Sequence, residues 1–394
     1  MREGWEYKTF GEVGTFLRGK SIQKADFVEH GLPCIHYGQI HTKFGVSVNK
    51  HLSEIPEEVY NKSIIASPGD IVIAITSEDL EGSCKSTAWL GDYDVAVSSH
   101  AAVYKHNLNP KFIAYYLRSN SFYIEKKKYA RGFKVMEIKP TDIARIPIPV
   151  PSEKIQSRVV SELDKINELI RLKKEQLKDY DNLAQSIFYE MFGDPVVNEK
   201  GWDVKKLGEE YKVSSSKRIM QDEWTTEGVP FLKVSDVVSK INGQNSEPST
   251  FISETTYSKL VDSNAVPVQN DILITSRGTL GLCYIVKNED RFYFQDGMIT
   301  WLAECKGNIT PLFLTYLFKN HHFLQQITSK ANKSTVAYIS ISQISKRKVP
   351  LPPLALQNLF AQRIELIEQQ KAEIQSTIAD LETLLASRMQ YWFD

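Results

Sequence analysis

The chain has 394 residues, of which 42% are hydrophobic and 24% charged, and its formal net charge at pH 7 is zero. This length exceeds what one hydrophobic core ordinarily holds, so we expect two or more domains. The composition is that of a soluble globular protein, no apolar run reaches the roughly 18 residues of a membrane-spanning helix, and the start MREGWEYKTFGEV lacks the apolar segment of a secretory signal.

The cysteines predict neither a disulfide framework nor a metal site. Cys34, Cys84, Cys283 and Cys305 show no C-x-x-C spacing and have no histidines at zinc-ligand spacing. We therefore expect reduced thiols in a cytoplasm, and neither a metal nor a cofactor.

The first half of the chain is repeated in the second half. GWEYKTFGE at residues 4–12 returns as GWDVKKLGE at 201–209, which is 197 residues later. Four further pairs of segments follow in the same order: G-[LV]-P at 31–33 and 228–230, GDIVIAITS at 69–77 and NDILITS at 270–276, FIAYYLRS at 112–119 and LFLTYLFK at 312–319, and RIPIPVP at 145–151 and KVPLPP at 348–353. Such ordered self-similarity indicates a tandem duplication with diverged loops.

Within each half the pattern predicts a mixed α/β domain. The β-branched runs IVIAI and ILI, bounded by Gly, Asp and Ser, predict strands. The segments 112–119 and 312–319 predict helices. The proline strips 145–151 and 348–353 predict a stiff, extended exit, because proline fixes φ and biases the residue before it away from helix.

After each proline strip the apolar period becomes helical. Apolar residues step by four and three over about four heptads, which is typical of a coiled-coil seam. The predicted seam residues are Val159, Leu163, Ile166, Ile170, Leu177, Tyr180 and Ile187 in the first helix, and Phe360, Ile364, Ile367, Ile374, Ile378, Leu381 and Leu385 in the second. Because an exposed stripe would aggregate, we expect the two helices to pair, and antiparallel pairing is the simplest arrangement for one chain.

Each stripe contains one lysine, Lys173 in the first helix and Lys371 in the second. A polar residue at a seam position often fixes register and partner number. A lysine whose ammonium reaches solvent from a partly exposed position is the alternative, and the sequence leaves both open.

The predicted fold class is therefore α+β (mixed α/β), with two pseudo-symmetric globular domains separated by a two-helix antiparallel coiled coil. The expected boundaries are 1–151 for the first domain, 152–194 for the central helix, 195–352 for the second domain and 353–394 for the C-terminal helix. The near-neutral charge predicts that the chain alone binds nucleic acid modestly, and that partners supply most of the phosphate neutralisation.

These segments resemble the specificity subunit of type I restriction–modification systems. The resemblance rests on the segments GW-x-x-K-x-[FL]-GE, G-[LV]-P, [GN]-D-I-[VL]-I and I-P-[IL]-P, which occur in this order. In each half they are followed by a glutamine (Gln156, Gln357) that opens a long helix. It extends over essentially the whole chain in both halves. One departure is the spacing of five residues from Pro151 to Gln156 against four from Pro353 to Gln357.

The resemblance implies a non-catalytic, cytoplasmic protein of a bacterium or archaeon. Each globular part would be a target recognition domain that reads one half of a split double-stranded DNA site. The helices would set the spacing and dock two modification (adenine methyltransferase) subunits, and restriction subunits would complete the cleaving enzyme.

Loops with polar and basic residues are the candidate DNA contacts, because such side chains read base edges and phosphates. A solvated surface charge is the alternative for each residue. The candidates are Lys20 and Gln23 in the first loop, Ser77 and Lys85 in the second, Arg131 and Lys134 in the third, and in the other half Lys217, Arg218, Ser276, Arg277, Thr279, Lys330, Lys333 and Ser334. Tyr37 and Gln39 are further candidates, although for Tyr37 packing on a strand is the favoured interpretation.

Catalytic motifs are missing from the sequence. It has no glycine-rich cofactor loop, no [NDS]-P-P-[YF] motif of adenine methyltransferases and no G-x-x-x-x-G-K-[ST] loop. The alternatives to a DNA-reading adaptor are a stand-alone enzyme acting on nucleic acid, the specificity subunit of a fused nuclease–methylase, and a protein scaffold without a DNA role.

Overall fold

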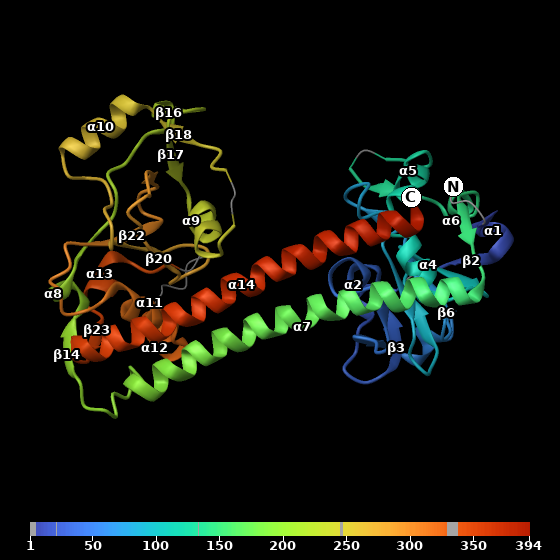
Figure 1. Cartoon of the computed structure of the whole chain (residues 1–394), viewed down its shortest axis with the longest axis horizontal. Helices are drawn as coiled ribbons and strands as arrows, with labels where there is room; N and C mark the ends of the chain where they lie inside the picture. The colour runs from blue at the N-terminus through green and yellow to red at the C-terminus, as the bar shows by residue number, and fades with distance from the viewer. Residues whose placement is uncertain (1–4, 21, 133, 245–246, 329–337) are drawn as a thin grey trace. The chain divides into compact units, whose positions relative to one another are not determined.

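The structure is a computed structural model that describes residues 5–20, 22–132, 134–244, 247–328 and 338–394. The chain forms two compact units: unit 1 comprises Met1–Glu175 with Gln375–Asp394, and unit 2 comprises Gln176–Ile374 (Figure 1). We call residues 5–151 of unit 1 head 1 and residues 195–352 of unit 2 head 2. The long helices α7 and α14 each contribute to both units.

Head 1 combines short helices with several small sheets. Its helices are α1 (Phe10–Val13), α2 (Tyr37–Thr42), α3 (Glu57–Tyr60), α4 (Pro110–Tyr116), α5 (Asn120–Lys127) and α6 (Pro140–Ile143), with a 3-10 turn at Lys24–Asp26. Its strands are β1 (Glu6–Thr9), β2 (Gly14–Arg18), β3 (Leu32–Ile35), β4 (Ser47–Val48), β5 (Ser53–Ile55), β6 (Ile64–Ala66), β7 (Ile71–Ala74), β8 (Thr76–Ser77), β9 (Ser86–Trp89), β10 (Val95–Val97), β11 (Ala101–His106), β12 (Met136–Glu137) and β13 (Pro147–Val150).

Head 2 has helices in an order that corresponds to head 1, with fewer strands between them among the described residues. Its helices are α8 (Leu207–Glu210), α9 (Val234–Ile241), α10 (Glu254–Asp262), α11 (Pro311–Lys319), α12 (His321–Thr328) and α13 (Ile341–Ser345), with a 3-10 turn at Gln221–Glu223. Its strands are β14 (Asp203–Lys206), β15 (Lys212–Ser214), β16 (Trp224–Thr225), β17 (Val229–Leu232), β18 (Phe251–Ile252), β19 (Ile272–Thr275), β20 (Cys283–Ile285), β21 (Tyr293–Phe294), β22 (Ile299–Ala303) and β23 (Lys348–Leu351).

The sheets of the two heads share one topology. The order β2-β11-β7-β9 in head 1 matches β15-β22-β19-β20 in head 2, and all of these pairs are antiparallel. The order β5-β3-β10 matches β18-β17-β21, and in both heads the last of these pairs is parallel. The mixed α/β fold and the duplication predicted from sequence are therefore confirmed in the arrangement of the strands.

Each head is closed by its own first and last strands. β1 pairs antiparallel with β13, and β14 pairs antiparallel with β23. The proline strips are thus edge strands in two-stranded sheets, where the missing N–H of proline breaks no central ladder. The chain consequently enters and leaves each head at one place.

The helices α4 and α11 start at similar caps. Asn109 precedes Pro110, and its side chain accepts hydrogen bonds from the N–H groups of Lys111 and Phe112. In head 2, Thr310 precedes Pro311 and accepts from Phe313 N–H. Proline in the first turn needs no N–H partner, so both helices begin before the apolar runs that predict them.

Two continuous helices follow the heads, α7 (Glu153–Phe192) and α14 (Leu354–Phe393), each of 40 residues. The two helices run antiparallel in both units, because residues with increasing numbers on α7 contact residues with decreasing numbers on α14. The contacts in unit 1 are an ion pair of Glu162 with Arg388 and one of Lys174 with Glu382 at 2.8 Å; those in unit 2 are an ion pair of Asp181 with Lys371 at 2.8 Å and a contact between the rings of Phe188 and Phe360.

The predicted seam residues lie in this helix pair at two levels of burial. Those at most 8% exposed are Val159, Leu163, Ile166, Ile170, Phe360, Ile364, Ile367, Ile374 and Ile378. Those that are half-buried are Leu177, Tyr180, Ile187, Leu381 and Leu385. Toward the end of α7 the buried position moves from Ile187 to Phe188, because a straight helix drifts from a strict heptad.

Lys371 pairs across the two helices. Its side chain is 17% exposed, and its ammonium lies 2.8 Å from Asp181 on α7 and 2.9 Å from Glu368 on its own helix. Burial alone would lower the pKa of Lys371, but the two carboxylates outweigh it and the pKa is raised. This contact favours the register role over simple exposure to solvent.

The glutamines that open the long helices make the same contacts in both units; we call Gln156 and Gln357 the capping glutamines. Gln156 Oε1 accepts from Asn109 N–H at 2.8 Å, and its Nε2 donates to Pro151 O at 2.8 Å. Gln357 Oε1 accepts from Thr310 N–H at 2.8 Å, and its Nε2 donates to the carbonyl of residue 352 at 2.8 Å. Both carbonyl partners lie five residues before the glutamine. The difference in spacing disappears when Pro352, and not Pro353, is matched with Pro151. Pro353 is an added proline, not the equivalent of Pro151.

Aromatic residues join the helix ends to the heads. In unit 1 the end of α14 lies beside α4 and α5 (Figure 1), where Phe393 packs 5.5 Å from Phe112 and its carbonyl accepts from Ser121 Oγ. Trp5 of the GW segment stacks on Trp392. Each helix end thereby extends the core of the head in its own unit.

His106, at the end of β11, is a half-buried imidazole whose pKa lies well below its ordinary value. Its Nδ1 accepts from Leu108 N–H at 3.2 Å, its ring stacks on Tyr104, and its Nε2 is buried without a hydrogen-bond partner in the described structure. Burial lowers the pKa of His106 to about 4, from 6.5, although Asp70 acts in the opposite direction. The folded chain therefore resists protonation of this residue more strongly than the unfolded chain does.

Acidification is expected to destabilise unit 1 through His106. The unfolded state binds the proton from about pH 6.5 downward, so this stability is complete above that pH and is lost as the pH falls toward 4. The change amounts to about 2 kcal/mol between about pH 7 and pH 5, at 1.36 kcal/mol per pKa unit. Urea unfolding of the wild type and of His106→Asn at both pH values would measure it. Equal pH dependence in the two proteins would contradict the assignment.

No helix among the described residues is both long enough and apolar enough to cross a membrane.

Candidate nucleic-acid interface

Head 1 contains a cavity of about 1100 Å³ where strands β7 and β8 end. Its walls come from α2, from loop 77–85, from His100 and from the junction of α4 with α5. The cavity brings together three predicted candidates, Ser77, Lys85 and Tyr37, which are far apart in sequence.

Loop 77–85 is held by two lysines whose ammonium groups point inward. Lys126 of α5 is 4% exposed, and its Nζ donates to the carbonyls of Glu81 at 3.0 Å and Ser83 at 2.6 Å. Lys85 Nζ donates to the carbonyl of His41 at 2.7 Å. Burial lowers the pKa of Lys126. Lys85 thus joins the loop to α2, and its role as a DNA contact stays a prediction.

Three rings line the cavity beside this loop. Tyr37 lies 4.9 Å from the His100 ring and 6.2 Å from the His41 ring, and His41 Nε2 is 3.1 Å from Thr76 O. Tyr37 begins helix α2, and its half-buried side chain also packs against a core cluster made largely of strand residues, as the alternative expects. The exposed imidazole of His100 presents both a ring face and polar nitrogens, the groups that stack on bases or bond to base edges.

Gln39 faces away from this wall. Its Oε1 accepts from His36 N–H at 3.0 Å and its Nε2 donates to Ser53 Oγ at 2.7 Å. Gln39 therefore fixes the start of α2 and its amide is already satisfied within head 1.

The other two predicted loops of head 1 lie beside the second. Lys20 is exposed and its backbone bridges to Ser98, next to the turn that carries His100. Gln23 is exposed and its N–H donates to Asp26. Strand β12, which follows the third loop, pairs with β8. Three sequence-distant loops thus form one surface.

The third loop holds two cations in different settings. Arg131 is mostly exposed, its backbone pairs with Glu137, and its Nη2 lies 3.5 Å from the buried Asp142. Lys134 is exposed. Arg18, which the sequence did not single out, forms an ion pair with Glu137 at 3.1 Å.

The second loop of head 2 differs sharply from that of head 1. Ser276 is 4% exposed and its hydroxyl lies 2.7 Å from Thr300 Oγ1, so it does not reach the surface, contrary to its choice as a base contact. Arg277 and Thr279 are exposed. The Arg277 guanidinium lies 5.4 Å from the Tyr338 ring centroid, and the two backbones pair. The second loop of head 2 therefore presents an arginine stacked on a tyrosine, where head 1 has the cavity.

The equivalence of the two loops comes from their backbone hydrogen bonds. Ile75 N–H donates to residue 100 and its carbonyl accepts from Ile138; Ser276 N–H donates to residue 298 and its carbonyl accepts from Ile339. Ser276 thus matches Ile75, not Ser77. Lys330, Lys333 and Ser334 of the third predicted loop lie outside the described residues.

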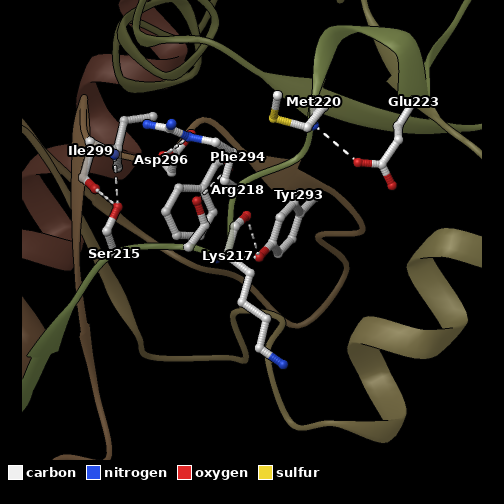
Figure 2. A network of polar contacts seen from close by, with 11 residues as sticks. Ser215, Lys217, Arg218, Met220, Glu223, Tyr293, Phe294, Asp296 and Ile299 are labelled. Carbon is white, nitrogen blue, oxygen red and sulfur yellow. Dashed lines mark hydrogen bonds and ion pairs between the residues drawn. The ribbon is translucent and has the colours of Figure 1, made fainter.

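Figure 2 shows the first loop of head 2, which is tied to strands β21 and β22. Lys217 N–H donates to Tyr293 Oη at 2.7 Å, while its side chain extends away from the network and reaches Ser263 Oγ at 3.1 Å. Arg218 Nε donates to Asp296 at 2.9 Å. Lys217 is therefore the better placed of the two to meet an anion, because a carboxylate already compensates Arg218.

The sequence matches a known family over both halves. The model of the type I restriction modification DNA specificity domain matches residues 2–179 and again residues 199–382. The chain belongs to this family.

Curated specificity subunits are similar to the chain at low identity. A putative type I restriction enzyme specificity subunit of Haemophilus influenzae is 24% identical over 274 residues, covering 68% of this chain and 67% of the relative. The type I restriction enzyme MjaVIII specificity subunit of Methanocaldococcus jannaschii is 21% identical over 383 residues, covering 93% and 86%. The EcoKI specificity subunit of Escherichia coli is 22% identical over 388 residues, covering 93% and 82%.

Solved structures share the fold. A chain from a study of complex assembly and conformational transition of the type I restriction–modification system superposes with a TM-score of 0.63 at 19% identity, covering 100% of this chain and 98% of the other. The type I S subunit from M. genitalium gives a TM-score of 0.51 at 16% identity, with the same coverage. The fold of this specificity-subunit family member is thereby established in both heads.

Several cavity residues of this specificity-subunit family member escaped the sequence analysis. Lys126 lies in the run KKK at 126–128, which resembles a solvated patch, yet it stands four residues after the buried Phe122 and so shares its inward face. His41 and His100 carry no motif. Their proximity depends on the contact of α2 with the β10–β11 turn, which one sequence does not reveal.

Proposed function

We propose that the chain is the DNA-specificity subunit of a type I restriction–modification complex and recognises an asymmetric bipartite site. Head 1, over residues 1–151, reads one half-site and head 2, over residues 195–352, reads the other. The helical segments 152–194 and 353–394 dock two modification (adenine methyltransferase) subunits, and restriction subunits join the same complex. The chain itself contributes recognition and no catalytic group.

The observation that carries this proposal is one scaffold with two different surfaces. Strand order and the capping glutamines repeat between the heads. The surface loops do not repeat: the ring-lined cavity with Tyr37 and His100 in head 1 is replaced by the stacked pair Arg277–Tyr338 in head 2. A conserved frame with divergent polar loops is what two readers of different sequences require, since phosphate contacts position and base contacts specify.

Charge supports the need for partners. The chain has 48 Lys and Arg residues against 48 Asp and Glu residues. A DNA-binding surface gains most of its affinity by neutralising phosphates. The modification subunits are therefore expected to supply much of the DNA affinity, while this chain supplies the choice of sequence.

The proposal predicts a new split methylation motif. In a methylation-free host, the partner modification subunit alone should leave DNA unmodified, and together with this chain it should methylate adenines in an asymmetric, interrupted sequence. Genome-wide adenine-methylation sequencing measures this outcome. His100→Ala serves as an internal control, because it should alter one half of the motif and leave the other half and the spacer unchanged.

Two results would contradict the proposal. An assembled complex that produces no new methylation would exclude the modification role. A His100→Ala variant that changed both halves would exclude the assignment of one half-site to each head.

A further inference from the structure

Head 2 carries a compact group of cations where its first and last strands meet; we call Lys206, Lys346, Arg347 and Lys348 the basic cluster. Lys206 on β14 is the direct cross-strand partner of Lys348 on β23. Lys346, Arg347 and Lys348 line one groove of about 670 Å³, whose other walls include Gln326, Gln343 and Asn198. Like charges placed opposite one another in a sheet cost stability, so the arrangement calls for an explanation.

The cluster has no acidic counterpart in the part of the chain that the structure describes. None of its four cations forms an ion pair there, whereas nearby Lys205 pairs with Glu210 at 2.9 Å. A carboxylate does contact the backbone of the cluster: Glu209 accepts from the backbone N–H of Lys206 at 3.3 Å. The side chains of Lys206, Lys346 and Lys348 are exposed.

Arg347 is the unusual member. Its guanidinium lies 4.5 Å from the Phe323 ring centroid, and its Nε is buried without a hydrogen-bond partner among the described residues. Burial lowers the pKa of this group. The buried Nε is out of reach of an external anion, so the case for an anion site rests on the exposed lysines beside Arg347 and on the lack of carboxylates paired with them in the described structure.

Head 1 lacks the cluster at equivalent positions. Phe10 N–H donates to Ile146 O, and Leu207 N–H donates to Arg347 O, so Ile146 and Arg347 occupy the same place. Ile146 is fully buried in the core of head 1. The strand registers place Thr9 and Pro147 where head 2 has Lys206 and Lys348.

The counter-charge of head 1 is also lost. Arg145, which is equivalent to Lys346, lies 3.7 Å from Asp142. The equivalent of Asp142 in head 2 is the neutral Gln343, whose amide donates to Ile327 O. Head 2 thus carries more cations and one carboxylate fewer than head 1 at this place.

We propose that the basic cluster binds neighbouring phosphates of the DNA backbone and anchors head 2 on the duplex independently of sequence. The proposal rests on the DNA-reading function proposed above. The cluster follows the candidate reading loop directly: Ile339 pairs with Ser276, and α13, which leads to Lys346, is five residues long, or about 7.5 Å at 1.5 Å per residue. Phosphate contacts beside a reading loop fix its register on the duplex.

The test measures the salt dependence of DNA binding. The full chain, assembled with its modification subunits, would be titrated with a random-sequence DNA duplex across a series of KCl concentrations. Each phosphate contact contributes about 0.9 to the slope of log K against log salt. The variant Arg347→Ile with Lys348→Gln should lower that slope by about 2, and should weaken binding by roughly tenfold or more at low salt.

The substitutions are chosen to keep head 2 folded. Isoleucine is the residue that head 1 itself carries at this position, and glutamine keeps most of the length of lysine. The control is Lys212→Gln with Lys259→Gln, which removes the same charge from exposed positions elsewhere in head 2. Thermal unfolding would verify that both variants fold, and Lys206→Gln with Lys346→Gln gives a second test of the cluster that leaves Arg347 in place.

The outcomes separate this proposal from the proposed function. A slope unchanged from wild type, with DNA binding intact, would overturn the phosphate anchor and leave the function standing. Unchanged DNA binding with weakened association of the modification subunit would overturn it in favour of an acidic protein segment in the groove. A methylation motif that changed at a base position would show sequence reading instead, and a wild-type complex that did not bind DNA would overturn both.

Discussion

Replacing Phe188 with alanine is expected to lower the free energy of unfolding of unit 2 by about 3–5 kcal/mol, the range for large-to-small substitutions of buried aromatic residues. Phe188 is 2% exposed and joins three elements. Its ring lies 5.6 Å from Phe313 of α11 and 5.6 Å from Phe360 of α14. The loss therefore combines the transfer free energy of the ring with a cavity that three rigid helices cannot close.

The measurement should resolve the two units, since they can unfold separately. Hydrogen exchange of the peptides that contain Phe360 and Phe313, followed in urea, reports on unit 2. Leu183→Ala is the matched control, because Leu183 lies on the same helix and is 47% exposed. It should cost less than about 1 kcal/mol. Equal losses from Phe188→Ala and Leu183→Ala would contradict the described packing.

Replacing Gln357 with methionine is expected to destabilise unit 2 by at least about 2 kcal/mol, although the volume is nearly kept. Gln357 is fully buried. Its amide accepts from Thr310 N–H and donates to the carbonyls of Pro352, at 2.8 Å, and Asn308, at 3.0 Å. Methionine leaves these backbone groups without partners inside the protein, and each unsatisfied group costs about 1–3 kcal/mol.

The duplicated capping glutamine supplies its own comparison. Gln156→Met should destabilise unit 1 by a similar amount and leave hydrogen exchange in unit 2 unchanged. Gln369→Met, on an exposed face of α14, controls for the substitution itself. A global loss of structure from either capping variant, or no effect from both, would show that the two hydrogen-bond sets do not act locally.

Regular features of this fold were predictable because they repeat at fixed intervals. The four-three stripe located α7 and α14, and most of the predicted seam is buried. The heptad pattern did not predict Phe188 as a buried residue, because near the end of α7 the helix packs against both α14 and the core of head 2, and a straight helix drifts from a strict heptad.

The equivalence of loop residues between the two heads was not predicted, because identical residue types need not occupy equivalent positions. Ser77 and Ser276 both end an apolar run, yet hydrogen bonding places Ser276 at Ile75. Pro353 similarly looked like the partner of Pro151, while the capping glutamines select residue 352. Backbone pairing, which depends on contacts distant in sequence, decides such equivalences.

The candidate site was predictable only in outline. Polar loops were identified, and head 1 does bring its three loops together through the pairing of β8 with β12 and the bridge of Lys20 to Ser98. The directions of the side chains were not predictable, since the ammonium groups of Lys85 and Lys126 donate to backbone carbonyls within head 1. The residue type alone does not determine whether a charged side chain points to solvent or into the protein.

The pairing of β1 with β13, and of β14 with β23, has an evolutionary consequence. Since each head begins and ends on adjacent strands, everything between them is inserted at a single joint, as in domains that tolerate insertion into a host chain. Genetic exchange at that joint can replace an entire head while the long helices keep their register. Each head can therefore be exchanged as one unit through its pair of terminal strands.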